Sequence, residues 1–169
     1  LELKSGIDKT KEVDQFELTN LKNIRFTSNV IDLENADVFI VTVPTPLKAS
    51  NQPDFLALLS ASKTVGRALK QRKGKRNSIP VVIYESTVFP GATEEICVPI
   101  LETSGLMFNQ DFFVGYSPER INIGDSQNNI DNIPKIVSAS DSLALKRLID
   151  LYKSALGAKI YAVSSIRVA

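Results

Sequence analysis

The amino-acid sequence predicts an α/β fold in which helices cover both faces of a parallel sheet. Two observations support this prediction. Short runs rich in Val, Ile and Phe recur along the chain, and stretches with apolar residues at helical spacing separate them. Strands that alternate with helices in this way form doubly wound parallel sheets that are buried on both faces. The 169 residues suffice for one domain, or for one domain with the remnant of another.

Five apolar runs are the expected strands. Pro44 closes the first run, and the second leads into two hydroxyl residues, Ser86 and Thr87. A weaker extended segment, residues 23–28, precedes all of them. The five expected strands lie within residues 37–43, 80–88, 112–116, 135–138 and 159–163.

Three stretches between these runs are expected helices. Residues 55–69 present one apolar stripe, and Ser140-Asp141 caps a later helix. Residues 91–103 should be interrupted near Pro99, because proline lacks the N–H donor that a helix needs. The cationic run KQRKGKR is interpreted as a solvent-exposed helix end, where positive charge suits the helix dipole, with a polyanion-binding patch as the alternative.

Composition excludes several classes of function. The 20 Lys and Arg residues nearly balance the 19 Asp and Glu residues, so no global positive field favours a nucleic-acid partner. The absence of His excludes a Ser-His-Asp triad and any His-ligated metal site within the chain, and we expect no metal. The single cysteine, Cys97, fits a reducing, cytoplasmic location. No apolar run approaches the ~18 residues needed to span a bilayer, so we expect no membrane partner.

The residues that follow each expected strand are the candidate site, since ligands of open α/β sheets bind beyond the carboxyl ends of the strands. Val43, Pro44 and Thr45 follow the first strand, where two prolines stiffen the loop. Ser86 and Thr87 follow the second, before a glycine that opens a helix whose free N–H groups favour negative charge. Taken singly, the first cluster is also explained as a rigid strand exit, and the hydroxyls of the second cluster are also explained as helix caps.

A third polar cluster, Glu119 and Arg120, follows the third expected strand. A surface ion pair is the ordinary explanation for such neighbours. Polar clusters at three consecutive strand ends nevertheless favour one shared ligand site. A complete dinucleotide site would also need a G-x-G-x-x-G loop, and the sequence contains none.

Six segments of the chain resemble the UDP-sugar 6-dehydrogenase family, particularly its UDP-N-acetylhexosamine branch. They occur in the family's order and cover nearly the whole chain. The motifs VPTP, STVFPG and YSPERIN-GD are together highly specific. The segments are LKSGIDKT, ADVFIVTVPTP, PDFLALLSA, YESTVFPGATEE, VGYSPERINIGD and SSIRVA.

The resemblance implies a truncated, Rossmann-like NAD-binding domain. Residues 1–30 are expected to be a remnant of its first half, either displaced or paired with another chain through an unpaired edge, because the first two strands are missing. Residues 31–163 correspond to its second part, and residues 164–169 to the start of a helix that leads to a central domain. The Gly-rich loop, the ribose-binding acid, the catalytic Lys, Asn and Cys, and the UDP-binding C-terminal domain are expected to lie outside this chain.

The activity that the resemblance implies is NAD-dependent oxidation of the C6 alcohol of a UDP-N-acetylhexosamine to the uronate. The family carries out this four-electron reaction through a cysteine thioester, here for surface polysaccharide precursors. The intact enzyme is expected to be a cytoplasmic homodimer, and this chain alone to be inactive. The alternatives are UDP-glucose as substrate, a stand-alone nucleotide- or sugar-binding module without catalysis, and a dehydrogenase of hydroxy acids or acyl thioesters, against which the Pro-Glu-Arg motif argues.

The resemblance also assigns roles to the first two clusters. Val43, Pro44 and Thr45 correspond to the loop that lies along NAD. Ser86 and Thr87 correspond to the strand end near the nicotinamide, where the Thr87 hydroxyl orients a catalytic water.

The third cluster corresponds to the sugar-binding loop of the family. Glu119 matches the glutamate that borders the sugar and assists thioester hydrolysis as a base. Arg120, Ile121 and Asn122 are the other expected substrate-binding residues. Ile123 stands where the family has Pro or a second Glu, which leaves its role unassigned.

Cys97 is not expected to be the nucleophile of the family. It lies among Ile96, Val98 and Ile100, where a small buried core residue is the ordinary interpretation. The catalytic residues expected within this chain are therefore Thr87 and Glu119.

Overall fold

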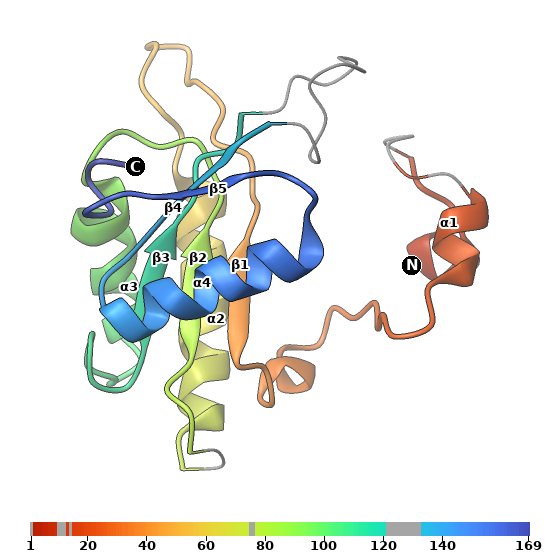
Figure 1. The fold of residues 1–169 in the computed structure, drawn as a ribbon, viewed down its shortest axis with the longest axis horizontal. Helices are drawn as coiled ribbons and strands as arrows, with labels where there is room; N and C mark the ends of the chain where they lie inside the picture. Colours follow the sequence, from red (N-terminus) through yellow and green to blue (C-terminus); the bar gives the residue numbers. More distant parts are fainter. Residues whose placement is uncertain (1, 10–12, 14, 75–76, 121–132) are drawn as a thin grey trace.

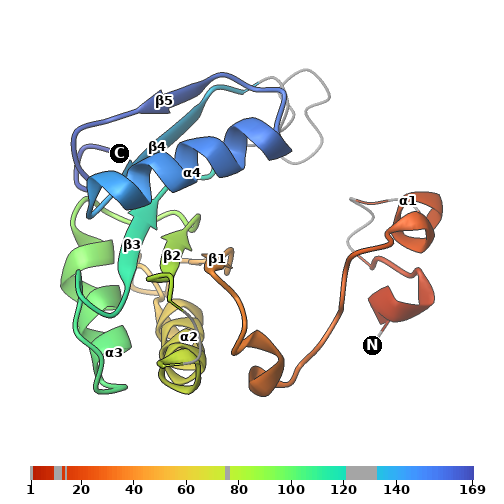
Figure 2. The same ribbon diagram turned by 60° about the horizontal axis from the view of Figure 1, so that its bottom comes forward.

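A five-stranded sheet forms the centre of the computed structural model, with α2 and α3 on one face and α4 on the other (Figures 1 and 2). The structure describes residues 2–9, 13, 15–74, 77–120 and 133–169. In chain order the elements are η1 (Glu2–Ser5), α1 (Gln15–Asn20), η2 (Val30–Leu33), β1 (Val38–Val41), α2 (Leu56–Arg72), β2 (Val81–Tyr84), η3 (Thr93–Cys97), α3 (Val98–Glu102), β3 (Phe113–Tyr116), β4 (Lys135–Ala139), α4 (Ser142–Ala155) and β5 (Ile160–Ala162).

The strands follow the order β1-β2-β3-β4-β5, which confirms the α/β class and all five expected strands. Strands β1, β2 and β3 are parallel, as expected. The expectation of a wholly parallel sheet is wrong at β4, which runs antiparallel to β3 and is itself parallel to β5. The sequence between β3 and β4 has no apolar stripe at helical spacing that would form a crossover helix, and a strand without a crossover returns antiparallel to its neighbour.

The two faces of the central strands bury different helices. Val82 and Tyr84 pack in the cluster that contains residues of α2 and α3, whereas Val81 and Ile83 pack in the cluster that contains residues of α4. All four residues are fully buried, as the period-2 geometry of a strand between two helical layers requires.

Gly115 of β3 allows α4 to approach the sheet. A Cβ built on it would lie 2.5 Å from a methyl carbon of Leu148 and 3.2 Å from the carbonyl oxygen of Ser138. The helix therefore packs directly on the backbone of β3 at this point.

The helix after β2 is interrupted as expected. Residues 93–97 form a π-helical turn, in which the N–H of Val98 donates to the carbonyl of Thr93, and α3 continues with Pro99 in its first turn. The N–H groups in the first turn of a helix have no acceptor within the helix, so proline, which lacks an N–H, is tolerated there. The local widening thus accommodates Pro99 without ending the helix.

The N-terminal residues lie apart from the sheet (Figures 1 and 2). Residues 23–28 belong to no strand, and the side chains of Arg25 and Thr27 both bond to the Asp32 carboxylate instead. Among the described residues, β1 pairs with β2 alone and is an edge of the sheet, with Ile40 46% exposed. The boundaries expected at residues 30 and 163 remain predictions.

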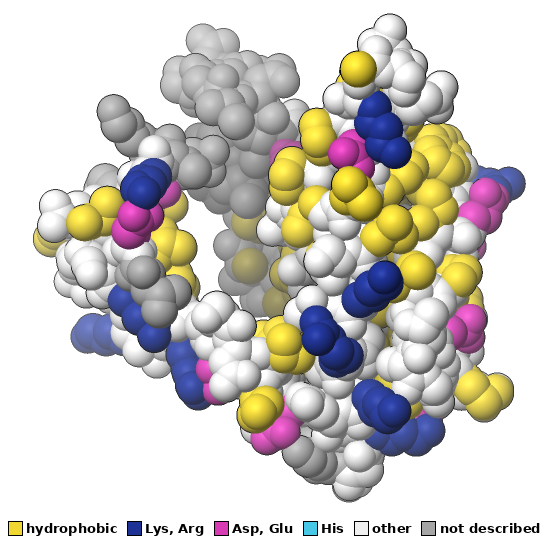
Figure 3. Space-filling view, turned by 180° about the vertical axis from the view of Figure 1, so that it is seen from behind, with side chains coloured by type: hydrophobic (Ala, Val, Ile, Leu, Met, Phe, Trp, Pro, Cys, Tyr) yellow, Lys and Arg dark blue, Asp and Glu magenta, His cyan; other side chains and the backbone are white. Residues whose placement is uncertain are grey.

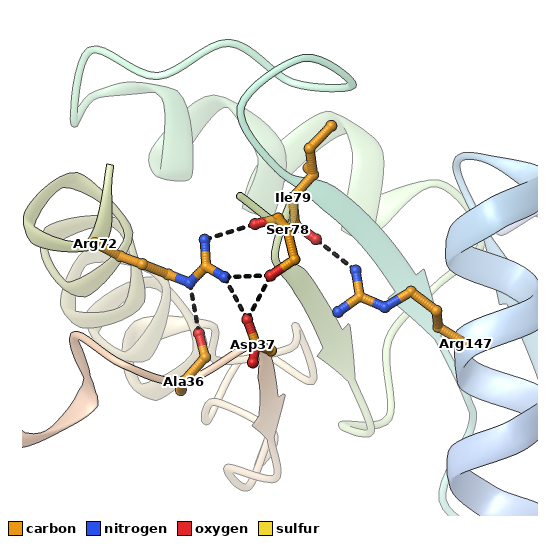
Figure 4. Close-up of polar contacts among 6 residues, drawn as sticks. All are labelled: Ala36, Asp37, Arg72, Ser78, Ile79 and Arg147. Atoms are coloured by element: carbon orange, nitrogen blue, oxygen red, sulfur yellow. Dashed lines mark hydrogen bonds and ion pairs between the residues drawn. The ribbon is translucent and has the colours of Figure 1, made fainter. Parts of the chain in front are cut away.

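At the amino ends of the strands, polar groups enclose the guanidinium of Arg72 (Figure 4). It donates to the carbonyl oxygens of Ala36 and Ser78, each over 2.8 Å. It also donates to the Ser78 hydroxyl over 2.8 Å and to the Asp37 carboxylate. Arg72 is only 3% exposed, so the expectation that the cationic run at residues 70–76 is solvent-exposed is wrong for this residue. The reason is that α2 ends beside the carbonyl oxygens of Ala36 and Ser78, which accept hydrogen bonds from the Arg72 side chain.

No helix within the described ranges is long and apolar enough to cross a membrane. The same part of the chain holds no group of three or more His, Cys, Asp or Glu side chains placed to bind a metal ion.

Candidate functional site

Two side-chain hydrogen bonds join the loops that follow β1 and β2. The Ser86 hydroxyl donates to the carbonyl oxygen of Val43 over 2.7 Å. The Thr45 hydroxyl donates in the opposite direction, to the carbonyl oxygen of Thr87, over 2.6 Å. The structure therefore brings together the two clusters predicted to contact a cofactor and fixes each loop against the other.

The hydroxyl residues of these loops differ in exposure. Ser86 is 3% exposed, and its hydroxyl serves the contact between the loops. Thr87 is exposed, so its side chain faces the solvent side of the strand end. Thr87 is thus open to solvent at the strand end, whereas the Ser86 hydroxyl is engaged in the contact between the loops.

Ser117, the residue after β3, extends these contacts to the third strand and to β4. The N–H of Ser117 donates to the carbonyl oxygen of Tyr84 over 3.0 Å, and the Ser117 hydroxyl donates to the carbonyl oxygen of Ile136 over 2.7 Å. Ser117 therefore ties the end of β2 to β4. Glu119 and Arg120 follow on the same edge of the sheet, and both are exposed. The other predicted sugar-binding residues, Ile121 and Asn122, and the neighbouring Ile123, lie outside the described residues.

A small pocket of about 110 Å³ lies beside these strand ends. Its lining combines residues after β2, Tyr116 of β3 and the C-terminal residues Ile166 to Ala169. Gly91 in its wall has a φ of +95°, and a Cβ there would lie 2.5 Å from the Arg167 guanidinium and 2.7 Å from a carboxylate oxygen of Glu95. The left-handed φ favours glycine at this turn, beside which Arg167 and Glu95 form an ion pair.

Exposed apolar side chains follow β1 and β2 near this edge. Leu47, Leu56 and Phe89 are 67%, 70% and 43% exposed, and the ring of Phe89 lies 5.7 Å from that of Phe55. Figure 3, seen from the side of α2 and α3, shows hydrophobic side chains gathered toward the top of the sheet-containing body, with charged side chains beside them and further cations lower down. The candidate site therefore has an apolar border as well as hydroxyl groups.

Cys97 is buried, as expected, at 1% exposure. Burial raises the pKa of its thiol to about 11, although hydrogen bonds with Ser62 and Tyr84 oppose this effect. The Tyr84 hydroxyl also lies 2.8 Å from the Ser62 hydroxyl, which satisfies both groups inside the core. A thiol that is neutral near pH 7 and enclosed by the core is not a nucleophile for an external substrate.

The sequence interpretation missed one polar cluster at the same edge. Glu85 accepts hydrogen bonds from Lys135 of β4 and from Tyr152 of α4. The sequence did contain a signal for this cluster. Glu85 ends an apolar strand on the side that faces the core, and a buried carboxylate requires a partner. Which cation supplies that partner depends on the antiparallel placement of β4.

Comparison with known proteins identifies the family of the chain. The model of the UDP-glucose/GDP-mannose dehydrogenase family, NAD binding domain, matches residues 7–156. The chain is 50% identical over 169 residues to a UDP-N-acetyl-D-glucosamine 6-dehydrogenase of Pseudomonas aeruginosa, covering 99% of this chain and 38% of that protein. It is 45% identical over 170 residues to an enzyme of the same name from Salmonella typhi, covering 100% of this chain and 38% of that protein. The chain thus spans 38% of the length of these curated relatives.

Solved structures confirm the Rossmann-type fold. The UDP-D-ManNAc dehydrogenase of Pyrococcus horikoshii superimposes with a TM-score of 0.80 at 29% identity, covering 98% of this chain and 38% of that one. A UDP-glucose dehydrogenase of Pyrobaculum islandicum has the same fold, with a TM-score of 0.81 at 22% identity over 99% of this chain and 38% of that one. With the family's domain model matched from residue 7 to residue 156, the chain belongs to the UDP-glucose/GDP-mannose dehydrogenase family and contains sequence of its NAD-binding domain.

Proposed function

We propose that this chain contributes to a dehydrogenase that oxidises the C6 alcohol of a UDP-N-acetylhexosamine to the uronate. The observation that carries the proposal is the contact between the loops after β1 and β2, formed by Ser86 with Val43 and by Thr45 with Thr87. This contact lies at the carboxyl ends of parallel strands, where open α/β sheets bind ligands. The names of the two relatives at 50% and 45% identity support the choice of an N-acetylated sugar.

NAD supplies a two-electron hydride acceptor, so oxidation of an alcohol to a carboxylate uses two NAD molecules. The residues of this chain then have separate tasks. The rigid loop of Val43, Pro44 and Thr45 forms a wall for the dinucleotide, and Ser86 holds that wall in place. The exposed Thr87 orients a water at the strand end. This assignment of roles explains why one hydroxyl is buried and the other is exposed.

The third strand end is assigned to the sugar. Glu119 and Arg120 are exposed on the edge of the sheet that carries Ser86 and Thr87. Arg120 offers donors to the oxygens of the sugar or its N-acetyl group, and Glu119 is assigned the role of a base. In the intact enzyme, a cysteine from outside this chain forms the thioester that water hydrolyses, because Cys97 is enclosed by the core.

The chain fits one part of NAD and not another. The strand-end loops fit the nicotinamide side, because they present hydroxyl groups on a fixed backbone. The pyrophosphate needs a Gly-rich loop at a helix N-terminus, and the sequence has no G-x-G-x-x-G. Residues beyond this chain must therefore complete the cofactor site, and the chain alone is proposed to lack turnover.

This missing loop also favours a second candidate, a nucleotide- or sugar-binding module without catalysis. The two candidates are separated by NADH absorbance with UDP-N-acetylglucosamine, UDP-N-acetylmannosamine and UDP-glucose. We expect turnover when the chain is part of a full-length protein, with the N-acetylated substrates preferred, and none from the 169 residues alone. Turnover by the isolated chain would refute the incomplete site, and preference for UDP-glucose would refute the N-acetyl assignment.

The wider setting is proposed on the same basis. The product uronate would enter surface polysaccharide synthesis, and the full-length enzyme would act as a cytoplasmic homodimer. Sedimentation of the full-length protein tests the dimer, and cell fractionation tests the location.

A further inference from the structure

Glu85, Lys135 and Tyr152, here called the strand-end cluster, meet on the α4 face of the sheet. The Lys135 ammonium lies 2.5 Å from one carboxylate oxygen of Glu85. The Tyr152 hydroxyl donates to the other carboxylate oxygen. The ammonium also lies 5.3 Å from the centre of the Tyr152 ring, so each member of the cluster contacts both others.

The strand-end cluster is enclosed rather than superficial. The side chains of Glu85 and Lys135 are 12% and 11% exposed, and Tyr152 is 5% exposed. Burial, and then the hydrogen bond to Glu85, raise the pKa of Tyr152, which keeps its phenol protonated as a donor. An enclosed ion pair keeps its geometry better than an exposed one, because water does not compete for the carboxylate.

The strand-end cluster spans three strands. Glu85 directly follows β2, and Lys135 is the first residue of β4, with β3 lying between these two strands. The backbone of Glu85 is fixed on the other side by its N–H, which donates to Val41 of β1 over 2.9 Å. The position of Glu85 is therefore set from both sides at the point where β2 ends.

Glu85 is also the residue before the candidate cofactor loop. The next residue, Ser86, donates to Val43, and Thr87 accepts from Thr45. A change in the position of the Glu85 backbone must therefore move the hydroxyl that holds the loop after β1. This connects α4 and β4 to the two loops through one short stretch of chain.

We propose that Glu85, Lys135 and Tyr152 are positioning residues, which fix Ser86 and Thr87 in the geometry that hydride transfer requires. This inference rests on the proposed function, because it names residues that support the same site. None of the three contacts the reacting atoms. They act through the backbone of residues 85–87, and their loss misplaces the loop rather than removing a ligand contact.

The test compares Glu85→Gln with a matched change at the opposite edge of the sheet, Asp37→Asn, in the full-length protein. Both changes replace the carboxylate of an ion pair by an amide, since Asp37 pairs with the buried Arg72. Both are expected to lower stability. Only Glu85→Gln is expected to lower kcat, on the order of tenfold or more, with little change in the KM for the UDP-sugar, since small misplacements cost large factors in rate.

Tyr152→Phe removes a single hydroxyl and should give a smaller fall in kcat, whereas Tyr161→Phe, on an exposed tyrosine, serves as its control. Equal losses of kcat in Glu85→Gln and Asp37→Asn at equal folded fraction would overturn the proposal. So would an unchanged kcat in Glu85→Gln.

A second measurement does not depend on turnover. Hydrogen–deuterium exchange of residues 85–91 is expected to become faster in Glu85→Gln than in Asp37→Asn, and unchanged exchange would overturn the positioning role. If the unmodified full-length protein oxidises no UDP-sugar, the proposed function fails while this measurement still tests the strand-end cluster.

Discussion

The buried Ser86 hydroxyl donates a 2.7 Å hydrogen bond to the carbonyl oxygen of Val43, 43 residues earlier in the chain. This bond joins the ends of two parallel strands at the edge where a ligand of such a sheet binds. Ser86, the second residue after β2, thereby fixes the position of the loop after β1. Several consequences can be measured.

Replacement of Ser86 by Ala removes this bond and leaves the Val43 carbonyl without its donor. We expect a loss of about 1 kcal/mol in the free energy of unfolding, measured by urea denaturation. We also expect weaker NAD binding by the full-length protein, measured by calorimetry. Thr64→Ala, which removes an exposed hydroxyl bonded to Ser60 on α2, is the control and should leave NAD binding unchanged.

Replacement of Gly115 by Ala should destabilise the fold, because the new Cβ would lie 2.5 Å from Leu148. Overpacking of this kind costs about 1–3 kcal/mol, measured by thermal or urea unfolding. Gly157→Ala is the matched control, since no atom lies within 4 Å of a Cβ at that position. A Gly115→Ala variant as stable as the control would contradict the close contact of α4 with β3.

The thiol of Cys97 should make stability fall at alkaline pH. Its pKa is raised from 9.0 to about 11 in the folded protein, so the unfolded chain loses its proton first as the pH rises. The stability that the neutral thiol contributes to the folded state is fully present below pH 9.0 and is lost as the pH rises toward about 11. Urea unfolding across this range should be less pH-dependent in Cys97→Ala than in the unmodified protein, and equal slopes would contradict the buried neutral thiol.

Arg120→Ala in the full-length protein tests the proposed role of Arg120 in binding the sugar. Loss of the guanidinium should raise the KM for UDP-N-acetylglucosamine by on the order of tenfold, since charge-assisted hydrogen bonds contribute about 1.5–3 kcal/mol. The KM for NAD should stay within a factor of about two, because Arg120 is assigned to the sugar. Arg67→Ala, on the surface of α2, is a control cation outside the site. A rise in the KM for NAD alone would show that Arg120 has been assigned to the wrong ligand.

Much of the fold followed from local patterns. Runs such as Val81–Tyr84 are apolar on both faces, and this pattern predicts a strand between two helical layers. Pro99 marked the interruption of the helix after β2, because a missing N–H acts within one helical turn. The clusters at Thr45 and Ser86 were likewise predictable, since parallel strands place their carboxyl ends along one edge.

Other features depended on partners that are distant in the sequence. Arg72 belongs to a run of cations that looks solvent-exposed, yet it is enclosed because carbonyls of Ala36 and Ser78 meet it at the amino ends of the strands. Residues 23–28 look extended in sequence, with Ile24 and Phe26 between polar residues, but they belong to no strand, because a strand forms only where another strand pairs with it.

By itself, the sequence determined the α/β class, the strand ends that carry Val43, Ser86 and Glu119, and the family to which these motifs belong. The tertiary structure alone decided that β4 runs antiparallel to β3 and that Glu85 meets Lys135, 50 residues later. The physical reason is range. Side-chain periodicity and proline geometry act over a few residues, whereas strand direction and the pairing of buried charges depend on which distant segments share one core.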